Sequence, residues 1–110
     1  MQQISPPPAV HATEVPADAY LLDVREEHEW SAGHVEGAVH IPMGDLVERV
    51  HEIPREQDVY VMCRVGGRSA QVAHYLNAHG WRTINVDGGM LAWEAAGRPM
   101  AGGNGHPCVV

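Results

Sequence analysis

The residues with the clearest chemical potential stand together in one heptapeptide, Cys63-Arg64-Val65-Gly66-Gly67-Arg68-Ser69, between an apolar run and an amphipathic one. One cysteine is followed there by two arginines and two adjacent glycines, at the point where a helix is expected to begin. Main-chain N–H groups gather at such a point, and they stabilise a thiolate and attract anions. This combination of residue types indicates a nucleophilic sulfur inside an anion-binding loop.

The loop has the features of a small cup. Gly66 and Gly67 allow positive φ angles, so that an arc of N–H groups can point inward, and the following helix adds about half a positive charge at its N-terminus. We therefore expect the pKa of the Cys63 thiol to lie below its free value of about 8.5. Arg64 and Arg68 add positive charge at the rim; the alternative interpretation makes both of them ordinary surface residues. The corresponding alternative for Cys63, an inert core thiol, does not call for flanking arginines and glycines.

The spacing within the loop bears on the kind of anion. Thiol phosphatases place an arginine six positions after the cysteine, so that five residues arch around a phosphate. Here position 69 is Ser69 and the arginine is Arg68, so the loop is one residue shorter. A tighter cup suits an anion that approaches through a sulfur atom, or a terminal sulfur carried by Cys63 itself. A thiol-dependent phosphatase or arsenate reductase stays as the less favoured alternative.

The elements around the loop alternate between short apolar runs and amphipathic stretches. Predicted strands lie at residues 20–24, 39–41, 59–62 and 83–86, with a short edge strand within 10–15; predicted helices lie at 26–30, 45–53, 68–79 and 90–96. Such alternation predicts an α/β fold, with a mostly parallel sheet of about five short strands and helices on both faces. Ligands of such sheets bind beyond the carboxyl ends of the strands, which is where the Cys63 loop leaves the 59–62 strand.

Sequence signals at the helix ends are also specific. Asp45 with Glu48 three residues later predicts a capping box at the start of the second helix. Leu46, Val50 and Ile53 follow at helical spacing on one face. Gly80 is placed to end the helix that follows the Cys63 loop.

Length and composition limit the remaining possibilities. The 110 residues predict one domain, at residues 10–99, with an extended lead-in at 1–9 and a flexible, glycine-rich tail at 100–110. The net charge of −7 argues against nucleic acid or an anionic membrane as the main partner. No apolar run approaches the roughly 20 residues that span a bilayer, and no signal peptide is recognised. Two cysteines in very different contexts favour a reducing, cytoplasmic location, and a monomer is the default for this size.

Other residues with chemical potential are interpreted structurally. Asp23 and Arg25 are expected to form an ion pair or loop clamp behind the site rather than to act in catalysis. The eight histidines show no metal-ligand spacing, so no metal site is predicted. Cys108 on its mobile tail could resolve a Cys63 persulfide or form a disulfide with Cys63, a hypothesis motivated only by the presence of two thiols in a small chain.

Four stretches of the chain, in this order, resemble the rhodanese family of sulfurtransferases. They are Leu22-Asp23-Val24-Arg25, residues 33–42 (Gly-His-Val-Glu-Gly-Ala-Val-His-Ile-Pro), residues 63–69, and residues 87–93 (Asp-Gly-Gly-Met-Leu-Ala-Trp). Each alone is moderately specific, and all four in order are highly specific. The resemblance implies a single rhodanese-like domain over roughly residues 20 to 99.

The resemblance also implies a mechanism. Cys63 would be the catalytic nucleophile, taking a sulfane sulfur from a small anionic donor such as thiosulfate and passing it as a persulfide to cyanide, a thiol or a dithiol, the last two on a small molecule or a protein. No metal or organic cofactor is implied. A persulfide carrier or a regulatory binding module without turnover is the non-enzymatic alternative. The residues expected to bind substrate are Arg64, Val65, Gly66, Gly67, Arg68 and Ser69.

Overall fold

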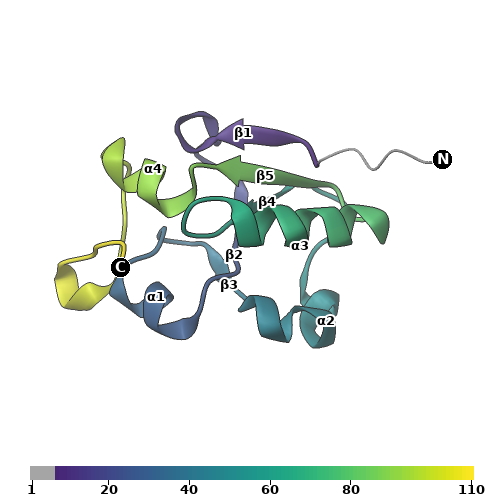
Figure 1. The fold of residues 1–110 in the computed structure, drawn as a ribbon, viewed down its shortest axis with the longest axis horizontal. Helices are drawn as coiled ribbons and strands as arrows, with labels where there is room; N and C mark the ends of the chain where they lie inside the picture. Colours follow the sequence, from purple (N-terminus) through teal and green to yellow (C-terminus); the bar gives the residue numbers. More distant parts are fainter. Residues whose placement is uncertain (1–6) are drawn as a thin grey trace.

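The computed structural model describes residues 7–110, and its five-stranded sheet is parallel at every strand pair (Figure 1). The strands are β1 (Ala9–His11), β2 (Tyr20–Asp23), β3 (Val39–His40), β4 (Val59–Met62) and β5 (Thr83–Asp87). Their order across the sheet is β1-β5-β4-β2-β3, which places β4 at the centre. The predicted α/β fold is confirmed. Residues 1–6 of the predicted lead-in lie outside the described residues.

Helices cover both faces of this sheet. One face carries α2 (Leu46–Arg49) and α3 (Gly67–Ala78), and the other carries α4 (Gly89–Ala95). Leu21 and Leu22 are neighbours in β2, yet they pack into the two different apolar clusters. That division follows from the alternation of side chains along a strand, and it explains why unbroken apolar runs form these strands.

Three elements meet where the central strand ends. The loop of residues 63–66 leaves the carboxyl end of β4 and leads into α3. On either side of β4, β2 is followed by α1 (Glu27–Ala32) and β5 by α4. Because all these strands run parallel, α1 and α4 begin at the same end of the sheet as the Cys63 loop.

The capping box predicted at Asp45 is wrong. The Asp45 side chain makes no capping hydrogen bond, because Asp45 ends a 3-10 helix (Met43–Asp45) with helical angles, φ −101° and ψ −1°. A capping residue needs an extended backbone to reach the amides ahead of it. The predicted long helix is also only the four residues of α2, followed by a 3-10 helix (Val50–Glu52).

A capping box forms instead at α1. Glu26 is its N-cap residue with an extended backbone, and the Glu26 main-chain N–H donates to Glu29 Oε1 at 2.9 Å. Glu29 is 7% exposed, the only buried residue of this short helix. The box therefore fixes a buried carboxylate in the first turn of α1.

After α4 the chain returns past α1, and Figure 1 shows its end beside that helix. Ala101 and His34 exchange two main-chain hydrogen bonds, and the N–H of Cys108 donates to the carbonyl of Ala32 at 2.9 Å. The N–H of Val109 donates to Glu94 Oε2 at 3.0 Å. These contacts define the course of residues 101–109, whose flexibility stays a prediction.

Candidate active site

Cys63 directly follows β4, and its side chain is 1% exposed. Gly66, the N-cap residue of α3, takes φ +120°, a conformation that residues other than glycine avoid. This turn brings the Gly66 N–H to 3.0 Å from Cys63 Sγ. Gly67, expected to share the positive φ, does not need it, because it already lies in the first turn of α3.

The surroundings of Cys63 favour the thiolate. Burial by itself would raise the pKa of the Cys63 thiol, but hydrogen bonds from the Ser69 hydroxyl and from the main-chain amides of Ser69, Gly66 and Val65 outweigh it. The pKa therefore lies below its ordinary value, the direction that the sequence predicts. Although Cys63 also belongs to the buried apolar cluster under α3, these donors distinguish it from an inert core thiol.

The first turn of α4 supports the loop from the β5 side. The N–H groups of Met90 and Leu91 donate to the carbonyls of Cys63 and Arg64 at 2.9 and 3.0 Å. The first N–H groups of α4, which have no partner within the helix, thus bind the loop. This close approach requires Gly89, since a Cβ atom there would lie 2.5 Å from the Cys63 carbonyl oxygen. Sequence reasoning treated this glycine only as part of a turn.

Asn85 in β5 is a second support that sequence reasoning missed. Its Nδ2 donates to the Gly66 carbonyl at 3.2 Å and to Asp87 Oδ1 at 3.3 Å. Asn85 is 4% exposed, and its Oδ1 has no hydrogen-bond partner among the described residues. The available signal was a polar residue at an inward position of a predicted buried strand, a conflict that often marks functional sites.

The two arginines of the loop have different partners. Arg68 forms a two-pronged ion pair with Glu29, with Nη1–Oε1 at 2.7 Å and Nη2–Oε2 at 2.9 Å. Arg64 donates from Nε to the main-chain oxygen of Val110 at 2.9 Å. Val65, between them in sequence, is 54% exposed at the outer side of the loop. The structure thus brings the predicted residues 63–69 together and adds Glu29, which the sequence reading left out.

Asp23 and Arg25 form the predicted ion pair behind the site. Arg25 is 0% and Asp23 1% exposed, and the Arg25 Nη2 lies 2.8 Å from Asp23 Oδ2. Arg25 also donates to the carbonyls of Glu29 and Gly33. One buried guanidinium therefore ties the end of β2 to two carbonyls near the C-terminal end of α1, a structural role.

Cys63 and Cys108 are both free thiols. Cys108 is exposed and held by its main chain against α1, where a Cβ atom on Gly33 would collide with the Cys108 backbone. The role of Cys108 in resolving a Cys63 persulfide stays a hypothesis.

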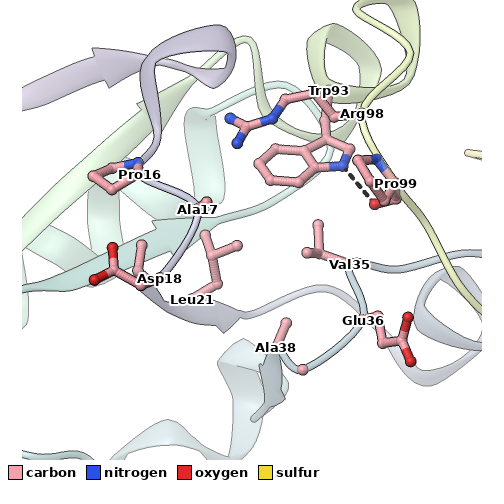
Figure 2. Close-up of a pocket in the computed structure, with 12 residues that line it drawn as sticks. Pro16, Ala17, Asp18, Leu21, Val35, Glu36, Ala38, Trp93, Arg98 and Pro99 are labelled. Carbon is pink, nitrogen blue, oxygen red and sulfur yellow. Dashed lines mark hydrogen bonds between the residues drawn. The ribbon is translucent and has the colours of Figure 1, made fainter.

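A cavity of about 500 Å³ lies elsewhere, between the segments before β2 and β3 and the end of α4 (Figure 2). Leu21, Val35 and Trp93 line it, and the Trp93 indole N–H donates to the Pro99 carbonyl at 3.0 Å. The Arg98 guanidinium lies 4.0 Å from the Trp93 ring centroid. None of the lining residues belongs to the Cys63 loop, so the cavity adds nothing to the chemistry at that sulfur.

Two further properties hold for residues 7–110. No group of three or more His, Cys, Asp or Glu side chains in this part is arranged to hold a metal ion. Over the same residues, no helix combines the length and apolar character needed to span a membrane.

Comparisons with known proteins agree with this geometry. The family model described as "Rhodanese-like domain" matches residues 9–96. The protein YtwF of Bacillus subtilis is 38% identical over 99 residues, covering 90% of this chain and 96% of its own. A sulfurtransferase of Allochromatium vinosum is 37% identical over 80% of this chain and 83% of its own.

Solved structures give the same result. The crystal structure of a rhodanese-related protein from Thermoplasma volcanium superposes with a TM-score of 0.81, at 28% identity, over 86% of this chain and 97% of its own. The matched region contains the loop of residues 63–69, both of its supports and Glu29. The chain belongs to the family of rhodanese-like domains.

Proposed function

We propose that this protein is a sulfurtransferase whose Cys63 carries the transferred sulfur as a persulfide. The observation that carries the proposal is the pair of donors aimed at Cys63 Sγ, the Gly66 N–H at 3.0 Å and the Ser69 hydroxyl at 3.2 Å. Donors fixed in place before reaction stabilise negative charge on sulfur without reorganisation. The sulfurtransferase among the relatives supports the same reaction class.

In the first step the Cys63 thiolate attacks the outer sulfur of the donor. With thiosulfate, the sulfur–sulfur bond of the donor breaks as a new one forms on Cys63, and sulfite leaves with the electron pair. In the second step a thiol, a dithiol or cyanide attacks the outer sulfur, and the Cys63 thiolate is released. Each step exchanges one bond to sulfur for another, so no external oxidant or reductant is needed. Ping-pong kinetics follow from the covalent intermediate.

The arrangement of Arg68 argues against phosphoryl chemistry. A phosphatase of this kind would need a guanidinium fork free for the phosphate, and both nitrogens at the end of Arg68 bind Glu29. Comparing p-nitrophenyl phosphate with thiosulfate as substrates tests this directly. We expect no phosphatase turnover that depends on Cys63.

Thiosulfate:cyanide assays of the wild type and of Cys63→Ser test the main proposal. Turnover should be lost in Cys63→Ser and retained in Cys108→Ser, which removes the other thiol of the chain. Near-normal turnover in Cys63→Ser would exclude Cys63 as the nucleophile. A protein that loads sulfur on Cys63 without turnover would instead be a persulfide carrier that requires a specific acceptor.

A further inference from the structure

We propose that Glu29 determines donor specificity: by occupying Arg68 it directs the Cys63 cup towards donors of low charge, hydropersulfides of the type R–S–SH, and away from dianionic thiosulfate. The inference rests on the proposed function and narrows its donor class. It assigns a role in substrate choice to a residue outside the loop of residues 63–69.

The contacts of Glu29 occupy the terminal fork of Arg68, the pair of nitrogens that would bind an oxyanion. Glu29 Oε1 and Oε2 accept from the two terminal nitrogens of Arg68 at 2.7 and 2.9 Å. Oε1 also accepts from the Glu26 N–H at 2.9 Å. The Glu29 side chain is only 9% exposed, and these hydrogen bonds hold the pKa of its carboxyl at about 2. The carboxylate is therefore ionised and fixed beside the cup at any physiological pH.

The helix cap does not explain why this residue is charged. A capping box accepts Gln as readily as Glu at this position, because only an oxygen acceptor for the N-cap N–H is required. Arg68 does not need the pair to fold into α3 either, since its side chain is 34% exposed and water could solvate it. The carboxylate thus adds a negative charge that capping does not demand, directly on an arginine of the Cys63 loop.

Arg25, the other cation near α1, does not replace the positive charge of Arg68 that Glu29 neutralises. Arg25 is fully buried and bound to Asp23, with its remaining donors on the carbonyls of Glu29 and Gly33. Two guanidinium groups at this end of the sheet are consequently neutralised by carboxylates. Arg64, which contacts the main-chain oxygen of Val110, is the remaining positive side chain of the loop.

This balance of charge should affect the binding of thiosulfate and of a hydropersulfide differently. Thiosulfate brings two negative charges, and it would approach a carboxylate without gaining a free guanidinium fork. A hydropersulfide brings at most one. The Cys63 thiolate attacks its outer sulfur, the sulfur–sulfur bond of the donor breaks, and the donor thiol leaves with the proton while Cys63 keeps the outer sulfur. Amides of the loop then bind the single negative charge of the new persulfide.

Glu29→Gln is the decisive variant, because Gln keeps an acceptor for the cap while it removes the charge and one of the two oxygens that bind Arg68. Glu27→Gln is its control: it removes the same charge from the same helix, at a side chain that is 79% exposed and has no contact with Arg68. Sodium thiosulfate and 2-hydroxyethyl hydropersulfide are the two probes. For both, the rate of sulfur loading on Cys63 is followed by intact mass, over a range of donor concentrations and of ionic strength.

We expect Glu29→Gln to load sulfur from thiosulfate about tenfold faster at low concentration, through a lower apparent dissociation constant, as removal of one charge beside a dianion predicts. Loading from the hydropersulfide should change less than about twofold, as should both rates in Glu27→Gln. Salt should slow thiosulfate loading more steeply in Glu29→Gln than in the wild type, because Arg68 is then free to attract the anion. Glu29→Asp, which keeps the charge, should retain the wild-type preference.

Equal acceleration by both Gln variants, or no change in the ratio of the two donors in Glu29→Gln, would overturn the inference. So would a steep loss of thiosulfate loading with salt in the wild type, a result that needs no variant to fold. Failure of the proposed function gives a different result, namely no adduct on Cys63 from either donor.

Discussion

The Ser69 hydroxyl lies 3.2 Å from the sulfur of Cys63, and neither side chain is more than 1% exposed. Ser69 stands in the first turn of α3 and Cys63 at the end of β4, so the contact joins the helix to the central strand. A buried hydroxyl that donates to a thiolate strengthens the charged form of the sulfur.

Ser69→Ala should therefore raise the pKa of the Cys63 thiol, because the thiolate loses one charge-assisted hydrogen bond. The pH profile of sulfur loading should move to higher pH, with little change at pH values where the thiol is already ionised. Ser31→Ala, at an exposed serine of α1 whose hydroxyl donates to Glu27 Oε1 at 3.4 Å, is the matched control. An unchanged profile in Ser69→Ala would mean that this hydroxyl does not tune the sulfur.

Gly89→Ala should damage the site from the α4 side. The added Cβ would lie 2.5 Å from the Cys63 carbonyl and 2.6 Å from that of Arg64, at φ +52°. Strain and the forced shift together should cost about 2–4 kcal/mol of unfolding free energy. In Gly44→Ala the added Cβ would have nothing within 4 Å, and the backbone is not in the left-handed region. The unfolding free energy should therefore change by less than about 1 kcal/mol. Urea unfolding of both variants checks this; equal midpoints would contradict it.

The buried clamp and an exposed ion pair should respond differently to the same substitution. Arg25→Lys removes the guanidinium fork from a fully buried pair and leaves carbonyls of α1 without donors, so we expect a loss of about 3–5 kcal/mol. Arg49→Lys changes the exposed pair with Glu52 and should lower stability far less, because solvent screens that pair. Thermal unfolding curves measure both losses. Similar small losses would show that the clamp contributes little.

The Glu29–Arg68 pair should make stability depend on pH in acid. The pKa of Glu29 is lowered from 4.5 to about 2, mainly by its hydrogen bonds with Arg68. A lowered pKa in the folded state means that the pair stabilises fully above pH 4.5 and that this contribution disappears as the pH falls towards 2. Glu29→Gln should therefore be less stable than the wild type by about 1–2 kcal/mol at pH 6 and by much less at pH 2.5. A constant difference across this range would contradict the assignment.

Much of this arrangement could be predicted from the sequence, because it depends on local signals. The apolar run of residues 59–62 predicts β4 with its observed bounds. The glycine pair at 66 and 67 predicts the loop that ends at Gly66. The apolar face of α3 follows from the spacing of Val72, Ala73 and Leu76, all of which are buried. Periodicity and turn chemistry carry such predictions.

The parts that were missed depend on contacts between distant segments. Glu29 reaches Arg68 across 39 positions, and Asn85 reaches Gly66 across 19. No local pattern shows that a helix of six residues will present its one buried side chain to a loop on the neighbouring strand. The predicted capping box at Asp45 failed for a related reason. Asp45 belongs to a 3-10 helix, and its helical backbone angles keep its side chain from capping α2.

The most direct test of the account is the intact mass of the protein after brief exposure to a sulfane sulfur donor, with the modified residue located by fragmentation. We predict a gain of about 32 Da, the mass of one sulfur atom, on Cys63 in the wild type, reversed by an added thiol and lost in Cys63→Ser. A protein that stays unmodified with both thiosulfate and a hydropersulfide, or that takes up sulfur only on Cys108, would contradict the central claim.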